Sequence, residues 1–284
     1  MKLLMFGATG QVAREVRRRA GAVNVQALSR AEADLANPAA CARAVAATDA
    51  DVVLNAAAWT NVDGAEAEEA AAAVVNGQAP TAMAEAAADR DLPFIQISTD
   101  YVFDGAGDRP RDERAATAPI NAYGWTKLAG EQGVRGAEGR HVILRTSWVF
   151  SAYGANFMKT MLRVGATRDE LTVVDDQIGG PTPAAAIADA CLAIAAAFTE
   201  GRGESGVFHF SGAPDVSWCG FAETIFTEAG MATRALPIAT ADWPTPAARP
   251  ANSRLDCTRI EQAFGVARPD WRAHLKDILA ELRP

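Results

Sequence analysis

A tyrosine and a lysine one helical turn apart are the residues of this chain best suited to chemistry. Tyr123 and Lys127 stand in the segment 121–127, and on a helix they share one face. A phenol with a pKa of about 10 is a poor acid or base at neutral pH unless its anion is stabilised. A lysine ammonium ~4 Å away, at an effective dielectric constant of roughly 20, could supply about 4 kcal/mol, or about three pKa units before any desolvation cost is subtracted. The pair therefore predicts proton transfer to or from a substrate oxygen, although Tyr-x-x-x-Lys alone also fits a solvated helix pair.

A glycine-rich turn near the start of the chain is typical of a dinucleotide-binding site. Residues 2–6 are predicted to form a buried strand, residues 7–13 are glycine-rich, and a helix is expected from about 11 to 20. In this context the glycines let the backbone approach a pyrophosphate, which then sits on the helix N-terminus. The predicted cofactor-binding residues here are Gly7, Thr9, Gly10, Gln11 and Val12. The alternative is a tight strand–helix turn that binds no ligand.

The end of the second predicted strand, residues 24–28, bears on the choice of cofactor. An acidic residue at this place usually binds the ribose 2′-hydroxyl of NAD, whereas an arginine suits the 2′-phosphate of NADP. Ser29 and Arg30 stand there, so NADPH is favoured and NADH is kept as a second option. Asp34 and Leu35 come slightly later and are expected to line the adenine pocket. The alternative for Arg30 is an ordinary surface charge.

Two further predicted strands bring candidate residues to the same edge of a sheet. The strand 51–55 ends in small residues that let a flat ligand pass close to the backbone, namely Ala56, Ala57 and Ala58. The strand 93–97 is followed by a hydroxyl-bearing string that includes Thr99. This hydroxyl could hydrogen-bond a substrate carbonyl or, alternatively, satisfy local backbone groups.

The order of the predicted elements indicates the fold class. Strands alternate with helices up to about residue 150, including a long alanine-rich helix at about 65–90. This predicts an α/β protein with a Rossmann-like doubly wound parallel sheet. Beyond residue 150 the pattern loosens into helices at about 156–166 and 184–198 and shorter elements. We expect an NAD(P)-binding domain formed by residues 1–150 and about 172–205, and a smaller C-terminal substrate-binding region formed by about 151–171 and 206–284.

Composition and charge argue against several other classes of protein. The 284 residues carry a formal net charge of −8, which is unsuited to a nucleic-acid surface. We expect no membrane span, because no apolar run approaches ~20 residues, and no signal-peptide core. The scattered cysteines fit reduced thiols in a cytoplasmic protein, and the histidines lack metal-ligand spacing. We predict no metal site and a monomer or weak homodimer.

Several strings that occur in order along the chain resemble a single family. They are the glycine-rich start and the strings Ser98–Phe103, Tyr123–Glu131, Arg145–Val149 and Arg249–Leu255. Together they closely resemble the dTDP-4-dehydrorhamnose reductase family of extended short-chain dehydrogenases/reductases, essentially from end to end. Tyr-x-x-x-Lys marks only the superfamily, whereas the strings beginning at Ser98 and at Arg249 are considerably more specific.

This resemblance implies NADPH-dependent reduction of the C4 ketone of dTDP-4-dehydro-L-rhamnose to dTDP-L-rhamnose. It implies that Tyr123 donates the proton, that Lys127 lowers the tyrosine pKa and holds the nicotinamide ribose, and that Thr99 orients the carbonyl. Tyr123 and Lys127 are both also expected to contact the cofactor. The residues implied to bind the nucleotide sugar are Asp100, Tyr101 and Trp148 along the sugar, with Arg249 and Asn252 on the nucleotide-sugar side.

The chain also departs from the family pattern at several positions. Ala13 replaces the more usual third glycine, and Trp59 and Trp125 add aromatic bulk near the expected cleft. Some members of the family dimerise through magnesium held by glutamates. Glu15 matches one of these, but Ala184–Ala186 stand where another glutamate would be needed. We therefore predict no metal-linked dimer.

Two alternatives to this function stay open at the level of sequence. The first is a reductase or epimerase of another nucleotide sugar, because one scaffold supports many such reactions. The second is a non-catalytic regulatory subunit, because the β subunit of methionine adenosyltransferase resembles the same family. The intact set of Thr99, Tyr123 and Lys127 favours catalysis.

Overall fold

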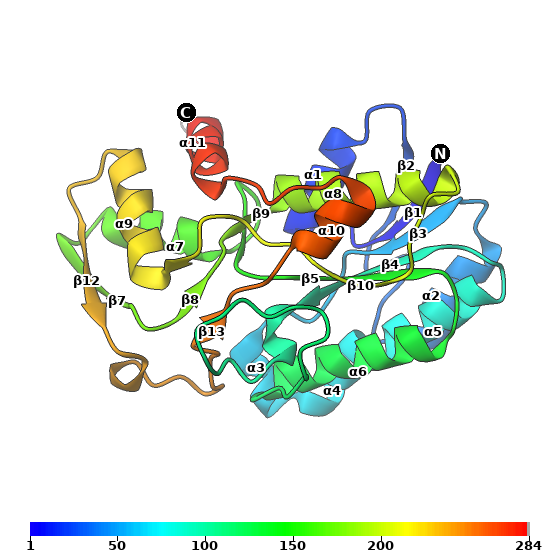
Figure 1. Ribbon diagram of the computed structural model, residues 1–284, viewed down its shortest axis with the longest axis horizontal. Coiled ribbons are helices and arrows are strands. Elements are labelled where there is room, and N and C mark those ends of the chain that lie inside the picture. The colour runs from blue at the N-terminus through cyan, green and yellow to red at the C-terminus, as the bar shows by residue number, and fades with distance from the viewer. Residues whose placement is uncertain (283–284) are drawn as a thin grey trace.

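A parallel sheet forms the centre of the computed structural model, which describes residues 1–282 (Figure 1). Its strands are β1 (Lys2–Phe6), β2 (Asn24–Leu28), β3 (Val52–Asn55), β4 (Phe94–Thr99), β5 (His141–Thr146) and β10 (Gly206–His209). They lie in the order β10-β5-β4-β3-β1-β2, and every neighbouring pair is parallel. The order reverses between β1 and β3, which is the switch point where doubly wound sheets bind ligands. The predicted fold class is confirmed.

Helices cover both faces of this sheet (Figure 1). One face carries α1 (Gln11–Arg19) and α8 (Ala184–Thr199), and the other carries α2 (Pro38–Ala47), α5 (Ala79–Ala88) and α6 (Ala122–Gly136). The side chains of β1 alternate between these layers. Leu3 and Met5 pack in the cluster of α1 and α8, whereas Leu4 and Phe6 pack in the cluster of α2 and α5. Burial on both faces explains why the strand is an unbroken apolar run.

The predicted long helix at about 65–90 is wrong, because the chain breaks there. The segment consists of α3 (Val62–Ala67), α4 (Glu69–Ala73), a π-helical turn η1 (Val74–Gln78) and α5. Glu68 leaves the helical conformation with φ −128° and ψ 40°. Pro80 has no N–H to donate to the carbonyl of Asn76. The Asn76 side chain instead bonds Trp59 and Thr126, so the irregular turn ties this segment to α6.

A second lobe follows, at the left of Figure 1. It contains α7 (Phe157–Gly165), β7 (Glu170–Val174), α9 (Trp218–Ala229), β12 (Arg234–Ile238) and α11 (Trp271–Leu282). β7 and β12 pair in parallel, and the fully buried Phe221 and Trp271 lie in the apolar cluster between the helices.

Shorter elements lie between the two lobes or, in the case of the helix at residues 258–264, against β10 and α8. They are the 3₁₀ turn η2 (Asp100–Val102), β6 (Val149–Phe150), β8 (Ile178–Gly179), β9 (Thr182–Pro183), β11 (Val216–Ser217), the 3₁₀ turn η3 (Thr240–Asp242), β13 (Asn252–Ser253) and α10 (Thr258–Phe264). β8 pairs with β11 and with β13, and β6 pairs with β9. The predicted division into two functional regions stays a prediction, and its boundary near residue 172 falls within β7.

The other general expectations concern membranes and cysteines. None of the helices within residues 1–282 is long and apolar enough to cross a membrane. The cysteines of the described chain, Cys41, Cys191, Cys219 and Cys257, are free and buried.

Candidate active site

The carboxyl ends of β1, β2 and β3 meet at one edge of the sheet. In the strand register Phe6 is paired with Leu28 on one side and with Asn55 on the other. The Gly7 N–H donates to Leu28 O at 3.0 Å, and the Ala56 N–H donates to Phe6 O at 3.0 Å. The three predicted cofactor segments, which begin at residues 7, 29 and 56, therefore come together as the sequence predicts.

The glycine-rich turn fits a dinucleotide phosphate. Gly7 has a φ of +96°, and a Cβ there would lie 3.3 Å from the Ala57 Cβ. Gly10 is the N-cap of α1 and provides no side-chain cap, so the first N–H groups of the helix are open to an anion. A cavity of about 480 Å³ lies beside this turn and is lined by Ala8, Thr9, Arg14, Arg17, Arg18 and Tyr153. Val12 is buried beneath the turn.

Gln11 connects the turn to the second lobe, which the sequence does not predict. Its Oε1 accepts hydrogen bonds from Ser151 Oγ at 2.8 Å and from Asn156 Nδ2 at 2.9 Å. Arg14 donates to Thr9 O and lies over the Tyr153 ring. Gln11 is about 140 residues from Ser151 and Asn156 in the chain, so no local pattern could have identified these partners.

The end of β2 contains a carboxylate that the sequence analysis missed. The N–H and hydroxyl of Ser29 both donate to Glu32 Oε2, at 2.8 and 2.7 Å. Arg30 forms an ion pair with Asp34 at 3.2 Å, and its side chain is 83% exposed. Leu35 is buried in the core beside this edge. The donors expected to bind a 2′-phosphate are thus bonded to carboxylates of the chain itself.

The predicted catalytic residues lie together at the end of β4. Thr99 is the last residue of β4, and its neighbour in β5 is Thr146. Asn121 begins α6 by accepting the Gly124 N–H at 2.8 Å. Gly124 and Gly130 let α6 approach closely, because a Cβ would overlap Tyr101 O at the first position and Asn76 O at the second. This close packing places the helix face with Tyr123 and Lys127 beside the strand.

Tyr123 lies edge-on to Tyr101, with ring centroids 5.5 Å apart and an interplanar angle of 79°. Burial raises the pKa of Tyr123 to about 12, with a smaller contribution from repulsion by Asp100, and a hydrogen bond with Thr99 opposes the shift. This is opposite to the predicted direction. The sequence predicted that the Lys127 ammonium would lower the pKa of Tyr123. In the structure, burial of the phenol away from water raises its pKa instead. At neutral pH Tyr123 is a protonated donor.

Lys127 is buried and directed at the end of β4. Its Nζ donates to Ile97 O at 2.7 Å, and the residue is 4% exposed. Burial lowers the pKa of Lys127 to about 8, and the charge of Glu131 opposes this shift. The ammonium therefore has further N–H donors to offer a ligand at the sheet edge.

Asp100 is a buried carboxyl beside these residues. Its Oδ1 accepts the Thr99 hydroxyl at 3.1 Å, and its Oδ2 lacks a well-oriented partner within the described residues. Burial raises the pKa of Asp100 to about 6, and the hydroxyls of Ser253 and Thr99 oppose the shift. An incompletely bonded buried carboxyl suits a hydrogen bond to a hydroxyl-bearing ligand.

Trp148 is held in a strained backbone conformation. Its φ is +49°, which a bulky residue rarely adopts, and its indole stacks on Trp218 with centroids 3.6 Å apart and planes at 12°. Thr182 N–H donates to Trp148 O at 3.1 Å, and Ser147 Oγ donates to Gly180 O at 3.0 Å. The conformation is thus fixed from both sides.

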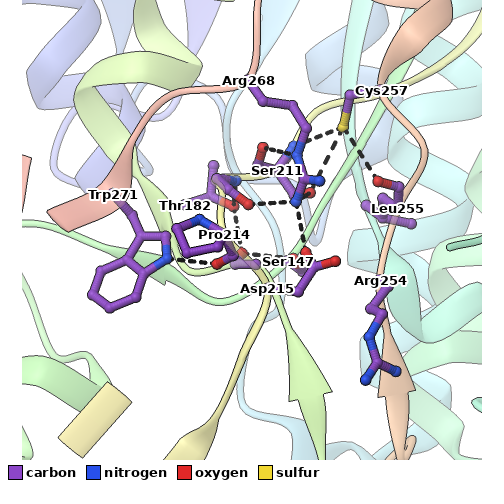
Figure 2. A network of polar contacts seen from close by, with 12 residues as sticks. Ser147, Thr182, Ser211, Pro214, Asp215, Arg254, Leu255, Cys257, Arg268 and Trp271 are labelled. Atoms are coloured by element: carbon purple, nitrogen blue, oxygen red, sulfur yellow. Dashed lines mark hydrogen bonds and ion pairs between the residues drawn. The ribbon is translucent and has the colours of Figure 1, made fainter. Parts of the chain in front are cut away.

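Figure 2 shows the polar network that supports this turn. Arg268 donates to Gly212 O and to Asp215 Oδ1, each at 2.6 Å. The Gly212 N–H donates to Thr182 Oγ1, and Trp271 Nε1 donates to Pro214 O at 2.7 Å. The chain around residues 211–215 is thereby fastened to the strand end that carries Trp148.

The two remaining predicted substrate residues lie on the C-terminal connector. Arg249 forms an ion pair with Asp63 of α3 at 2.9 Å and donates to Ala247 O. Asn252 is buried, and its Nδ2 donates to Arg109 O at 2.8 Å while its Oδ1 accepts from Arg254. In this structure Asn252 orders the loop around residues 105–111.

The two unusual tryptophans differ in their surroundings. Trp125 lies on α6 with 54% of its surface exposed. Trp59 is partly buried against Ala65 and Ala122, and its indole donates to Asn61 O at 2.9 Å.

Comparisons with known proteins match the chain to one family. A family model described as RmlD substrate binding domain matches residues 1–283. A dTDP-4-dehydrorhamnose reductase of Burkholderia thailandensis is 45% identical over 96% of each chain. The crystal structure of a dTDP-4-dehydrorhamnose reductase from Clostridium acetobutylicum is 36% identical with a TM-score of 0.92, covering 99% of both chains. That of Bacillus anthracis, in complex with NADP, is 32% identical with a TM-score of 0.91 and the same coverage.

Proposed function

The chain belongs to the RmlD substrate binding domain family of dTDP-4-dehydrorhamnose reductases, and from this premise we propose which residues carry each part of its reaction. The reaction is the NADPH-dependent reduction of the C4 ketone of dTDP-4-dehydro-L-rhamnose to dTDP-L-rhamnose. The enzyme is therefore an oxidoreductase that acts on a nucleotide sugar.

The cofactor is assigned to the edge where β1, β2 and β3 end. The glycine-rich turn fits the pyrophosphate, because Gly7 and Gly10 leave the backbone open and α1 presents its N-terminus. Residues 29–35 lie at the adenosine side, and Ala56–Ala58 provide a flat surface for the cofactor between the two ends. When bound, the cofactor supplies the hydride.

Proton transfer is assigned to Tyr123. Its phenol is protonated at neutral pH, since its pKa is about 12, and it can donate to a ketone oxygen as negative charge develops there. Thr99, whose hydroxyl opposes the rise of the Tyr123 pKa, is assigned to orient the same oxygen. Lys127 offers its free N–H donors to the cofactor ribose beside them.

The sugar side of the site is assigned to the elements after β4 and β5. Asp100 offers an incompletely bonded oxygen, and Tyr101 and Trp148 supply apolar faces that suit a sugar ring. Arg249, held by Asp63, is assigned to the nucleotide side. Asn252 acts there by fixing the neighbouring loop.

The observation that carries this assignment is the meeting of Thr99, Tyr123 and Lys127 at the end of β4. The test is the loss of NADPH absorbance with enzymatically generated dTDP-4-dehydro-L-rhamnose. Tyr123→Phe should lower kcat at least about 100-fold, because general acid catalysis contributes that much, and should leave NADPH binding unchanged. Near-full activity of the variant would remove Tyr123 as the proton donor. NADPH binding by the wild type without turnover of this sugar would overturn the reaction itself.

Further proposals concern location and assembly. A cytoplasmic location is supported by the free thiols of the described chain. We propose a monomer or weak homodimer that uses no bridging metal and binds no nucleic acid. The carboxylate of Glu15 is 2% exposed as a residue and already forms an ion pair with Arg18 at 2.8 Å, which leaves it poorly suited to a shared cation. We likewise propose a cofactor domain formed by residues 1–150 and about 172–205, and a substrate region formed by about 151–171 and 206–284.

A further inference from the structure

A buried ion pair lies directly behind Lys127, where α6 packs on β4 and β5. Arg145 donates from Nε to Glu131 Oε1 at 2.9 Å and from Nη2 to Glu131 Oε2 at 2.6 Å. Ser98 Oγ donates to the same Oε1 at 2.6 Å. The side chains of Arg145 and Glu131 are only 4% and 2% exposed. Both carboxylate oxygens are thus fixed by a bidentate contact that water does not reach.

The far side of Arg145 is bonded to a neutral group. Its Nη1 lies 3.4 Å from His209 Nε2, and His209 Nδ1 lies 3.0 Å from Arg111 O. Burial and the charge of Arg145 lower the pKa of His209 to about 3, so the imidazole is neutral. It accepts from Arg145 and donates to the carbonyl of Arg111. Glu131 therefore supplies the negative charge of this cluster.

Glu131 also stands one helical turn after Lys127. Residues four apart on a helix lie about 5–6 Å from each other at their Cβ atoms, so the carboxylate is close to the lysine. Lys127 is itself buried, with its Nζ on a neutral carbonyl, Ile97 O. A buried ammonium without a compensating charge loses its proton readily. The charge of Glu131 opposes the lowering of the Lys127 pKa by burial.

Other ionisable groups sit on the elements packed against α6. They are Asp63 and Glu66 of α3, Glu69 of α4, Glu85 of α5, Asp100 and Tyr101 of η2, and His141 and Arg145 of β5. Glu131 is the charged side chain that acts on the pKa of Lys127, in opposition to burial. The positive charge of Arg145 opposes that of Glu131, so a test must compare variants that differ only in Glu131.

We propose that Glu131 is a positioning residue of the reductase: clamped by Arg145 and Ser98, it supplies the buried negative charge that keeps the Lys127 ammonium ionised beside the cofactor site. The proposal rests on the proposed function, because an ionised Lys127 serves the reaction by binding the cofactor ribose. We assign Glu131 no contact with cofactor or substrate. It acts through Lys127.

The charge state of Lys127 can be measured without turnover. The chain contains four lysines, Lys2, Lys127, Lys159 and Lys276, so selective ¹³Cε-lysine labelling gives a short set of NMR titrations. Lys127→Met assigns the resonance of interest. The wild-type resonance should titrate with a midpoint of about 8. Because the ammonium is lost as pH rises through this midpoint, any change that lowers the midpoint reduces the charged fraction at neutral pH.

The informative substitutions remove the Glu131 carboxylate, either alone or together with the guanidinium of Arg145. Glu131→Gln should move the Lys127 midpoint down by about one pH unit or more. Since Glu131→Gln leaves Arg145 buried and unpaired, a double variant with Arg145→Met removes that cation as well, and circular dichroism checks that each variant folds. The double variant should titrate below Arg145→Met alone, because the two differ only in the charge of residue 131. Glu131→Asp, which keeps the charge, should restore most of the wild-type value. Glu69→Gln, at an exposed position of α4, is the control and should change nothing.

If the Arg145–Glu131 pair only stabilises the fold, the Lys127 titrations should give a different result. In that case neither Glu131→Gln compared with wild type nor the double variant compared with Arg145→Met would lower the midpoint of Lys127, and the proposal would be overturned. The kinetic counterpart is the alkaline limb of kcat/KM, which should shift downward by the same amount as the NMR midpoint. Failure of the wild type to reduce the sugar would refute the proposed function while leaving the titration interpretable.

Discussion

Two charged clusters at the same edge of the sheet use similar residues in opposite surroundings. The buried cluster consists of Ser98, Glu131 and Arg145, and the surface cluster consists of Ser29, Arg30, Glu32 and Asp34. In each, a serine hydroxyl donates to a glutamate and an arginine pairs with an acid. The arginine is 4% exposed in the buried cluster and 83% exposed in the surface cluster.

This difference in exposure decides what each cluster can do. Exposed ion pairs are screened by salt and compete with water, so their members can exchange one partner for another at small cost. A buried pair has no water to replace a lost partner, and removing one member leaves an uncompensated charge. The surface cluster is therefore suited to releasing its donors to a ligand. The buried cluster is suited to holding Lys127 in a fixed environment.

The largest expected effect is on stability, and it tests the contrast directly. Arg145→Met should lower the free energy of unfolding by about 3–5 kcal/mol, because Glu131 is left buried without its bidentate partner. Arg30→Met makes the same chemical change in the surface cluster and should not move the transition measurably. Urea unfolding at constant m-value checks both variants. Equal midpoints for the two variants would show that exposure does not separate the clusters.

The sequence identified Ser29, Arg30 and Asp34 of the surface cluster as candidates, although it missed Glu32, and it identified none of the buried cluster, for a physical reason. Arg30 and Asp34 follow β2 within one short segment, so the strand and its end could be predicted together. Glu131 and Arg145 belong to different elements, and only the packing of α6 on β5 brings them into contact. Trp148 and Trp218 likewise meet across the two lobes. Local periodicity cannot encode such pairs.

The same limit explains the errors in the fold. The strands β1, β2, β3 and β4 were predicted within a few residues, because burial on both sheet faces dictates apolar runs, whereas β10 and β12 were not predicted. The helix at about 65–90 was wrong for two reasons. Pro80 is a local signal that was not used, and Asn76 takes partners in distant segments, Trp59 and Thr126. The predicted direction of the Tyr123 pKa failed similarly, since burial depends on tertiary packing.

The contrast between buried and exposed positions extends to the tryptophans, where we expect an effect of intermediate size on kcat/KM. Trp218 stacks on Trp148 and contacts Phe157 with centroids 4.4 Å apart, so it fixes the indole proposed to face the sugar. Trp218→Ala should lower kcat/KM about tenfold, mainly through a higher KM for the nucleotide sugar. Trp218→Phe should recover most of the loss. Trp125→Ala, at a position 54% exposed, should behave as wild type. A loss at Trp125 equal to that at Trp218 would place the sugar on the exposed side of α6.

The smallest effects should come from the surface cluster, and they concern the cofactor. A 2′-phosphate must take Ser29 from Glu32 and Arg30 from Asp34, so two carboxylates of the chain compete with it. Glu32→Gln removes one competitor and should tighten NADPH binding about two- to fivefold relative to NADH.

Arg30→Ala should weaken NADPH binding by about fivefold or less and leave NADH unchanged. Dissociation constants from cofactor fluorescence check both values, and added salt should shrink both differences because the groups are exposed. Equal effects of Arg30→Ala on the two cofactors would remove Arg30 from phosphate recognition. A hundredfold loss would show that the bound phosphate excludes water from this cluster, which would then resemble the buried one.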